Sequence, residues 1–287
     1  MTPILSLRAA TQVFSSRKQS GWGRVFNRAV DGVDLDVHEG ETLAIVGESG
    51  SGKSTLAKLL LLLNRPTTGE VLYRGHSLAT LDATQRSEYR RNVQAVFQDP
   101  ASSLNPRMQV AETLGHVVKR HALADAAGQD AFIAKHLASV GLNPPALFMP
   151  RYPSQLSGGQ QQRIAIARAM MLEPRIVVAD EPLSSLDVSI QSQVLELMRE
   201  LKRRTHVGFV IISHDLNAME SIADRVAVMH KGKIVEIGTA QQVFQQPSHD
   251  YTRLLLRARL STDPRIARRQ IHAAASEPLR PPATQPL

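Results

Sequence analysis

Short apolar runs alternate along the chain with longer segments of helical spacing. The apolar runs are rich in β-branched residues, which favours buried strands. These strands are expected at residues 42–46, 93–98, 176–179, 207–212, 226–229 and 234–237. Apolar residues that recur three and four positions apart predict helices between them. These helices are expected at residues 56–63, 82–91, 161–172, 188–203, 241–246 and 251–257.

Two regions follow a different pattern. Residues 4–13 and 29–37 show mixed alternation, which predicts two antiparallel strands near the N-terminus. The segment between them, residues 15–28, carries several cations and one tryptophan and predicts an exposed basic loop. Residues 110–141 have helical spacing in two segments divided near Gly128, with few strand signals. We therefore expect a helical subdomain over about residues 99–155.

Composition limits the class of protein. The 287 residues suffice for one large α/β domain or two small ones, and the 43% of hydrophobic residues supports a sizeable core. The chain has no cysteine, which excludes disulfides and thiolate metal sites. No apolar run approaches the length of a membrane span, and the first residues lack a signal-peptide layout. We expect the folded domain over residues 1–258 and a disordered tail over residues 259–287, which is rich in proline and arginine.

Net charge leaves the partner open. The formal charge of +8 suits nucleic acid, an acidic lipid surface or a nucleotide, and it also suits a merely solvated surface. The motifs must decide between them.

A glycine-rich segment, residues 47–55, follows the strand at residues 42–46 and precedes a helix. Strand, glycine loop and helix are the context that a phosphate-binding P-loop requires. The glycines let backbone N–H groups turn toward β- and γ-phosphates, and the helix N-terminus adds its positive dipole end. Lys53 is expected to reach the phosphates, and the Ser54 hydroxyl to hold Mg²⁺. The segment predicts binding of a nucleoside triphosphate, but it does not indicate which process the triphosphate drives.

Two carboxylates end the apolar strand at residues 176–179. A buried strand can deliver Asp180 to the Mg²⁺ side of the P-loop, which is the Walker B role. Glu181 then lies one residue further along, where a carboxylate can polarise the water that attacks the γ-phosphate. The alternative is an ordinary strand that ends in an acidic turn.

A second anion-binding turn precedes a helix at residues 156–160, with the sequence Leu-Ser-Gly-Gly-Gln. Two such turns cannot face one γ-phosphate unless two copies of the chain pack head to tail. This pentapeptide resembles the signature of the ABC ATPase family, and the resemblance covers about residues 4–256. It implies a doubly wound P-loop NTPase core of the α/β class, an antiparallel β subdomain and an α-helical subdomain.

Further family motifs follow in order. Gln98 resembles the Q-loop glutamine, which senses Mg²⁺ and water. Residues 184–187 resemble the D-loop, although Ser185 stands where alanine is common, and Asp187 ends the motif. His214 follows a strand and resembles the switch histidine that contacts γ-phosphate; alone, such a histidine is more often structural. Phe14 is the best match to the aromatic that stacks on adenine, but it could equally be a core residue.

The resemblance implies the following roles. The catalytic residues are Glu181 and His214. ATP is bound by Phe14, Gly47, Glu48, Ser49, Gly50, Ser51, Gly52, Lys53, Ser54, Thr55 and Gln98, and Val30 could complete the adenine pocket. The Mg²⁺ contacts are Ser54, Gln98 and Asp180. The residues that contact the partner subunit's ATP are Leu156, Ser157, Gly158, Gly159 and Gln160, with Asp187 in the D-loop.

The process that ATP hydrolysis would drive is inferred from the insertions and fused segments that different members of this family carry. DNA-repair members carry long coiled-coil insertions and most exporters carry fused membrane helices, and this sequence has neither. Residues 97–108, 187–191 and 247–252 resemble the importer subgroup for dipeptides, oligopeptides and nickel. We therefore expect the ATP-hydrolysing subunit of an importer. The alternatives are a soluble ATPase that acts on nucleic acid and the ATPase subunit of an exporter.

The expected partners follow from the same resemblance. They are a second ATPase subunit, either a copy of this chain or a paralogue, and two transmembrane permease subunits. An extracytoplasmic solute-binding protein would act indirectly, and no nucleic acid is expected. The chain would then lie peripherally on the cytoplasmic face of the inner membrane, with ATP and Mg²⁺ as its ligands. The transported solute cannot be inferred, because an ATPase subunit does not contact it.

Overall fold

A computed structural model of the chain describes residues 2–17, 24–99 and 103–258. The expected tail at residues 259–287 and the middle of the expected basic loop lie outside the described residues. Within them, no helix is both long enough and apolar enough to cross a bilayer.

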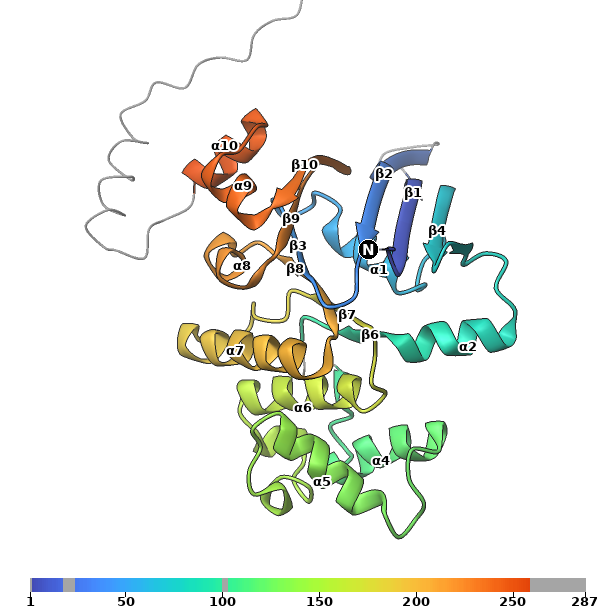
Figure 1. Cartoon of the computed structure of the whole chain (residues 1–287), viewed down its shortest axis with the longest axis vertical. Coiled ribbons are helices and arrows are strands. Elements are labelled where there is room, and N and C mark those ends of the chain that lie inside the picture. Colours follow the sequence, from blue (N-terminus) through green and yellow to red (C-terminus); the bar gives the residue numbers. More distant parts are fainter. Residues whose placement is uncertain (1, 18–23, 100–102, 259–287) are drawn as a thin grey trace, which may run out of the picture.

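A six-stranded sheet forms the centre of the molecule, in the order β10-β9-β3-β8-β7-β6 (Figure 1). In this order the strands are Lys233–Thr239, Arg225–His230, Thr42–Val46, Gly208–Ser213, Ile176–Asp180 and Val93–Val96. Strands β9, β3, β8, β7 and β6 are parallel, and β10 pairs antiparallel with β9. The β9–β10 turn places Lys231 and Gly232 at positive φ, as the hairpin turn requires. The α/β class expected from the sequence is confirmed.

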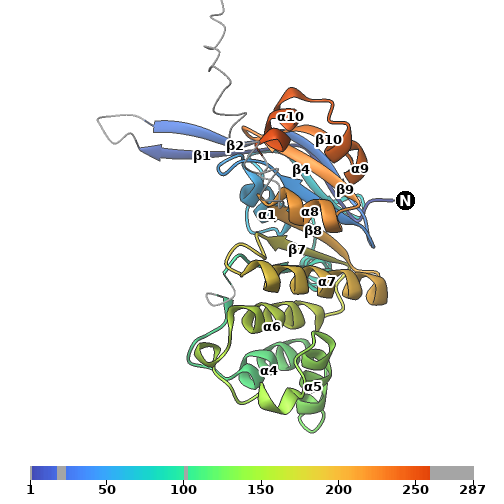
Figure 2. The ribbon, with the colours of Figure 1, turned by 90° about the vertical axis from the view of Figure 1, so that its left-hand side faces the viewer.

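A second, antiparallel sheet has the order β2-β1-β4-β5. Its strands are Arg24–Val37, Leu5–Arg17, Thr68–Tyr73 and His76–Ser77. The expected loop at residues 15–28 is wrong in part, because Phe14 to Arg17 pair with Arg24 to Asn27. Strand β4 pairs only as far as Thr11, so the rest of the hairpin continues as a two-stranded arm. Figure 2 shows this arm projecting beyond the body of the molecule.

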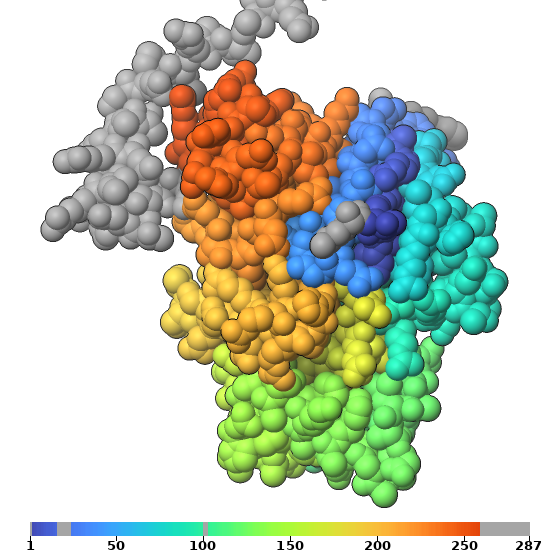
Figure 3. Space-filling model, in the orientation of Figure 1, coloured from blue at the N-terminus to red at the C-terminus, as the bar shows by residue number. Residues whose placement is uncertain are grey.

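Helices cover both the sheet and one end of the molecule. They are α1 (Lys53–Leu60), α2 (Ala83–Asn92), α4 (Val110–His121), α5 (Gln129–Ser139), α6 (Gly158–Met170), α7 (Val188–Thr205), α8 (Leu216–Ile222), α9 (Ala240–Gln245) and α10 (Asp250–Arg257). Two 3₁₀ turns, Pro145–Leu147 and Pro153–Gln155, lie between α5 and α6. Helix α6 lies between α7 on one side and α4 and α5 on the other (Figure 1). Helices α4 and α5 form the lower end of the molecule in Figure 3.

Two hydrophobic cores lie on opposite faces of the central sheet. Leu43 and Ile45 of β3 join the core shared with the antiparallel sheet and α1, whereas Ala44 and Val46 join the core shared with the other helices. All five residues of β3 are buried. Successive side chains of a strand point to opposite faces, so a strand covered on both faces has a continuous apolar run rather than an alternating one.

Candidate functional site

The carboxyl ends of four parallel strands meet at one edge of the central sheet. Val46 of β3 lies opposite Ser213 of β8, and Ile212 of β8 lies opposite Asp180 of β7. Val96 of β6 lies opposite Ala179. Because these strands run in parallel, the segments that follow them leave from the same edge. The P-loop, both carboxylates, His214 and Gln98 therefore leave the sheet at this edge.

The P-loop wraps closely against its surroundings. Gly47 and Gly52 have φ of 151° and 107°, in the region that favours glycine. A Cβ on Gly47 would overlap the carbonyl oxygen of Met229, and one on Gly52 would overlap that of Ala29. Helix α1 begins at Lys53, three residues earlier than the helical spacing predicted. The loop thus leads directly into the helix N-terminus, where free N–H groups favour an anion.

Lys53 is buried beneath this loop. Its Nζ donates to the carbonyl oxygens of Gly47 at 2.8 Å and Glu48 at 2.7 Å. Burial lowers the pKa of Lys53, and the charges of Glu181, Asp180 and Glu48 act in the opposite direction. The ammonium is thus held across the loop, where it could meet phosphate oxygens.

Ser54 and Asp180 join α1 to β7. The Ser54 Oγ donates to Asp180 Oδ1 at 3.0 Å. Burial is the main cause that raises the pKa of Asp180; the charge of Glu181 also raises it, and the Ser54 hydrogen bond lowers it. A hydroxyl and a carboxylate are hard oxygen ligands, so this pair fits Mg²⁺. The described residues contain no group of three or more His, Cys, Asp or Glu that could hold a metal ion.

Glu181 and His214 form a pair across the ends of β7 and β8. The Glu181 Oε1 lies 3.4 Å from His214 Nδ1, an ion pair when the imidazole is protonated. Glu181 has φ of 47°, and its backbone N–H donates to the Ile212 carbonyl oxygen at 2.9 Å. The Glu181 side chain is 20% exposed, so the carboxylate retains limited access to water. Such a carboxylate can accept a proton from water or polarise it.

The loop after His214 is fixed by Asp215. The Asp215 Oδ1 accepts hydrogen bonds from the N–H groups of Asn217 and Ala218, at 2.9 and 3.0 Å, and so caps α8. Its own N–H donates to Ser213 Oγ at 2.9 Å. The cap holds the backbone on one side of His214, and β8 holds it on the other.

The turn at residues 156–160 starts α6 as the sequence predicts. Ser157 is the N-cap and forms a capping box with Gln160. Ser157 and Gly158 are exposed, whereas Gly159 is buried. A Cβ on Gly159 would lie 2.6 Å from Cγ2 of Ile190 on α7. Among the described residues, no hydrogen bond joins this turn to the P-loop.

Asp187 and Gln98 lie beside these elements. Asp187 is the exposed N-cap residue of α7. Gln191 Nε2 donates to the Leu183 carbonyl oxygen at 3.0 Å and to that of Leu186 at 3.1 Å, which ties the segment before Asp187 to α7. Gln98 is exposed two residues beyond β6.

The structure places the two residues expected at the adenine, Phe14 and Val30, in different environments. Phe14 is 43% exposed and pairs with Asn27 in the hairpin arm, so it is not a core residue. Val30 is wrong as a pocket residue, because it is fully buried in the core between the two sheets. The side chain of a residue that packs inside the core cannot reach a ligand at the surface.

Tyr251 is a contact that the sequence analysis missed. The Glu48 N–H donates to Tyr251 Oη at 3.3 Å, so α10 supports the P-loop across more than 200 residues of sequence. The His230 ring packs against the Tyr251 ring with centroids 3.8 Å apart. The resemblance at residues 247–252 includes Tyr251, but no local pattern tells which distant loop it contacts.

Comparisons with known proteins give one family. A family model described as ABC transporter matches residues 30–184. The dipeptide transport ATP-binding protein DppF of Escherichia coli (strain K12) is 44% identical over 257 residues, which cover 89% of this chain and 76% of that protein. The oligopeptide transport ATP-binding protein OppF of Lactococcus lactis subsp. lactis (strain IL1403) is 43% identical over 265 residues, which cover 92% and 82%.

Solved structures have the same fold. The ATP-binding cassette MJ0796, in a dimeric post-hydrolysis state bound to ADP and Pi, matches with a TM-score of 0.71 and 28% sequence identity. The match covers 82% of this chain and 98% of that chain.

Proposed function

This chain belongs to the ABC transporter family of ATPases, and we propose that it is the ATP-hydrolysing subunit of an importer of dipeptides or oligopeptides. The observation that carries the proposal is the likeness to peptide-transport ATPases over about nine-tenths of the chain. The meeting of the P-loop, Asp180 and the Glu181–His214 pair at one sheet edge supports hydrolysis. A nickel-type solute remains an alternative within the same subgroup.

Different residues of the site bind the phosphates, the adenine and the metal ion of ATP. Backbone N–H groups of residues 47–55 and the Lys53 ammonium bind the phosphates, and Phe14 stacks on the adenine. Ser54 and Asp180, with Gln98, would hold Mg²⁺, which would supply positive charge to neutralise the phosphate oxygens. Glu181 accepts the proton of the attacking water as it adds to the γ-phosphorus, and ADP leaves. His214 Nδ1 lies 3.4 Å from Glu181 Oε1, so His214 would orient this carboxylate, and it would contact the γ-phosphate.

A second ATPase subunit completes the site. The exposed turn at Ser157 and Gly158 offers N–H groups to the ATP of a partner subunit, with Asp187 beside it. The P-loop of each subunit would then face the turn of the other, in a head-to-tail pair. The partner is a second copy or a paralogue. This arrangement accounts for two anion-binding turns in one chain.

Permease docking is proposed at the groove between the core and the helical end. A pocket of about 670 Å³ lies there, with Arg90 on α2, Arg120 on α4 and Arg168 on α6 among its lining residues. Arg168 Nη1 donates to the Ser103 carbonyl oxygen at 2.6 Å, which ties the segment after Gln98 to α6. A change at the γ-phosphate could move this segment through Gln98. The chain would thus sit peripherally on the cytoplasmic face of the membrane, beneath its permeases.

Uptake into proteoliposomes tests the function. The chain would be purified with the permeases and the peptide-binding protein of the same organism, and ATP would be enclosed on the ATPase side. Labelled dipeptide should accumulate, and Lys53→Ala should abolish both uptake and hydrolysis. Lys135→Ala, an exposed lysine on α5, is the matched control and should retain both.

Three results would oppose the proposal. They are hydrolysis without permease association, uptake of labelled nickel but not of peptide, and ATPase activity that only nucleic acid stimulates.

A further inference from the structure

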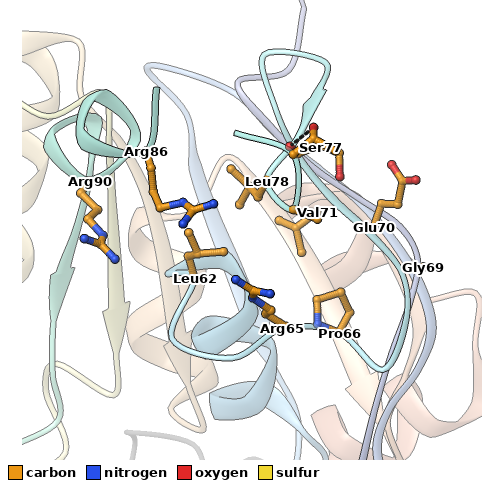
Figure 4. Close-up of a pocket in the computed structure, with 12 residues that line it drawn as sticks. Leu62, Arg65, Pro66, Gly69, Glu70, Val71, Ser77, Leu78, Arg86 and Arg90 are labelled. Carbon is orange, nitrogen blue, oxygen red and sulfur yellow. Dashed lines mark hydrogen bonds between the residues drawn. The ribbon is translucent and has the colours of Figure 1, made fainter. Parts of the chain in front are cut away.

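A pocket of about 440 Å³ lies in the antiparallel part of the molecule, apart from the P-loop. The segment after α1, strand β4, the segment after β5, and α2 enclose it. Its floor includes Leu62, Val71 and Leu78, of which the last two are buried. Three arginines, Arg65, Arg86 and Arg90, line its sides. Figure 4 shows the guanidinium groups of Arg65 and Arg86 converging beside Leu62.

No acidic side chain among the described residues forms an ion pair with the arginines of this pocket. Arg86 Nη2 donates to the Leu81 carbonyl oxygen at 2.9 Å, but its Nε is buried without a hydrogen-bond partner. Within the part of the chain that the structure describes, none of the three arginines forms a salt bridge. Glu70 is the one acidic residue among those lining the pocket, and Figure 4 shows its carboxylate directed away from the arginines. A buried, unpaired N–H beside two unpaired cations favours an anionic partner.

We propose that this pocket binds a small organic anion. Its acidic group pairs with Arg65 and Arg86, whose planar guanidinium groups suit carboxylate, sulfonate or phosphate oxygens. Its apolar part covers Leu62, Val71 and Leu78. An inorganic ion would leave this floor wet, so the floor and the arginines together favour an amphipathic ligand.

Two neighbouring pockets provide an internal control. Arg86 and Arg90 line both this pocket and the larger groove between α2 and α4, whereas Arg65 lines only the first and Arg120 only the second. Arg65 and Arg120 are both exposed, so either can be replaced without disturbing the core.

Fluorescence titration tests the site on the full chain. The probe is 1-anilinonaphthalene-8-sulfonate, with Mg²⁺–ADP present in excess so that the P-loop is filled. A ligand of this size should bind one saturable site with a dissociation constant in the range of roughly 10 to 100 μM. Arg65→Gln should raise this constant at least about fivefold, and Arg120→Gln should change it by less than about twofold.

The uncharged analogue N-phenyl-1-naphthylamine separates charge from packing. It lacks the sulfonate, so Arg65→Gln should leave its binding unchanged. The proposal is overturned by the absence of a saturable site, by equal effects of Arg65→Gln and Arg120→Gln, or by equal sensitivity of both probes to Arg65→Gln. Circular dichroism of each variant establishes that it is folded. None of these measurements depends on the transport function.

Discussion

At the scale of single residues, burial sets the charge behaviour of the candidate site. Asp180 lies at the end of a buried strand, and its pKa is raised mainly because burial disfavours the carboxylate. Glu181 beside it adds a second negative charge, and Ser54 offsets part of the effect by donating a hydrogen bond. Without ligand, the folded chain therefore binds a proton at Asp180 more tightly than the unfolded chain does.

The first prediction concerns Asp180→Asn in the nucleotide-free protein. A raised carboxyl pKa contributes stability at low pH that is lost as pH rises through the folded pKa. Asn carries no charge, so the melting temperature of the variant relative to wild type should increase from about pH 4.5 to about pH 7.5. The gain should be a few degrees at most, because the site is partly open to solvent. Differential scanning calorimetry is the measurement.

The matched control is Asp187→Asn, which changes an exposed carboxylate at the start of α7. It should shift the melting temperature little at any pH, because Asn caps helices about as well as Asp. A pH-independent difference for Asp180→Asn, or a loss of stability at neutral pH, would show that burial does not control this carboxylate.

Sequence was sufficient for the residues that lie in local motifs. The P-loop, Asp180 and Ser157 could be predicted because a strand or helix terminus fixes each one within a few residues. Tyr251 and Val30 could not be placed, because one depends on a contact between distant segments and the other on which face of the sheet is covered. The contact of Tyr251 and the burial of Val30 are both determined by the tertiary structure.

At the scale of elements, the hairpin arm presents two different faces. Residues paired across the strands share a face, so Phe14 lies with Asn27 on one face and Phe26 with Ser15 on the other. Arg24 and Arg28, two positions from Phe26 on the same strand, share its face. Phe14 is 43% exposed and Phe26 is 68% exposed. The arm was not expected from sequence, because a ribbon exposed on both faces lacks the apolar alternation of a half-buried strand.

The second prediction uses these two phenylalanines as a pair. Phe14→Ala should raise the dissociation constant for ATP about tenfold, because stacking on a base contributes roughly 1–3 kcal/mol. Phe26→Ala removes an aromatic of the same size from the opposite face and should change the constant by less than about twofold. Isothermal titration calorimetry with a non-hydrolysed ATP analogue is the measurement. Equal effects of the two variants would remove Phe14 from the adenine site.

The third prediction concerns the packing of α6 against α7. In Gly159→Ala the new methyl would lie 2.6 Å from Cγ2 of Ile190, so one helix must shift. We expect a loss of about 1–3 kcal/mol in the free energy of unfolding, measured by urea denaturation. In Gly158→Ala the methyl would lie 3.3 Å from the end of the Leu186 side chain, which can move, so the loss should be smaller.

A double variant identifies the cause of that loss. Ile190→Ala removes Cγ2, so Gly159→Ala should cost less in this background than in the wild type. Additive effects of the two substitutions would mean that the close contact is not the source of the destabilisation.

At the scale of the whole molecule, two cores on one sheet set the geometry of the edge where ATP would bind. Residues of β3, β7 and β8 alternate between the two cores, which holds the register of the parallel strands. The register in turn brings the ends of these strands together. The family and the α/β class could be predicted from sequence, because the motifs occur in the same order as the strands that carry them. The pairing of two chains is a proposal, because it rests on contacts between chains, which the structure of one chain does not contain.

The central claim is that ATP is hydrolysed between two subunits, and Glu181→Gln tests it most directly. Gln keeps the shape of the side chain but is a far weaker proton acceptor, so hydrolysis should fall at least about 10²-fold while ATP binding persists. Asp180 and Lys53 are unchanged in this variant. ATP should then hold two subunits together at their P-loops and at the turns of residues 156–160.

Size-exclusion chromatography with light scattering, in the presence of Mg²⁺–ATP, is the decisive measurement. The variant should elute as a dimer, alone or with its paralogue, and should return to a monomer when ATP is replaced by ADP. The additional variant Ser157→Arg, which places a bulky cation in the turn, should abolish the dimer while the single chain still binds ATP. If hydrolysis stops and no dimer forms with either partner, or if hydrolysis continues unchanged, the account of a shared site is contradicted.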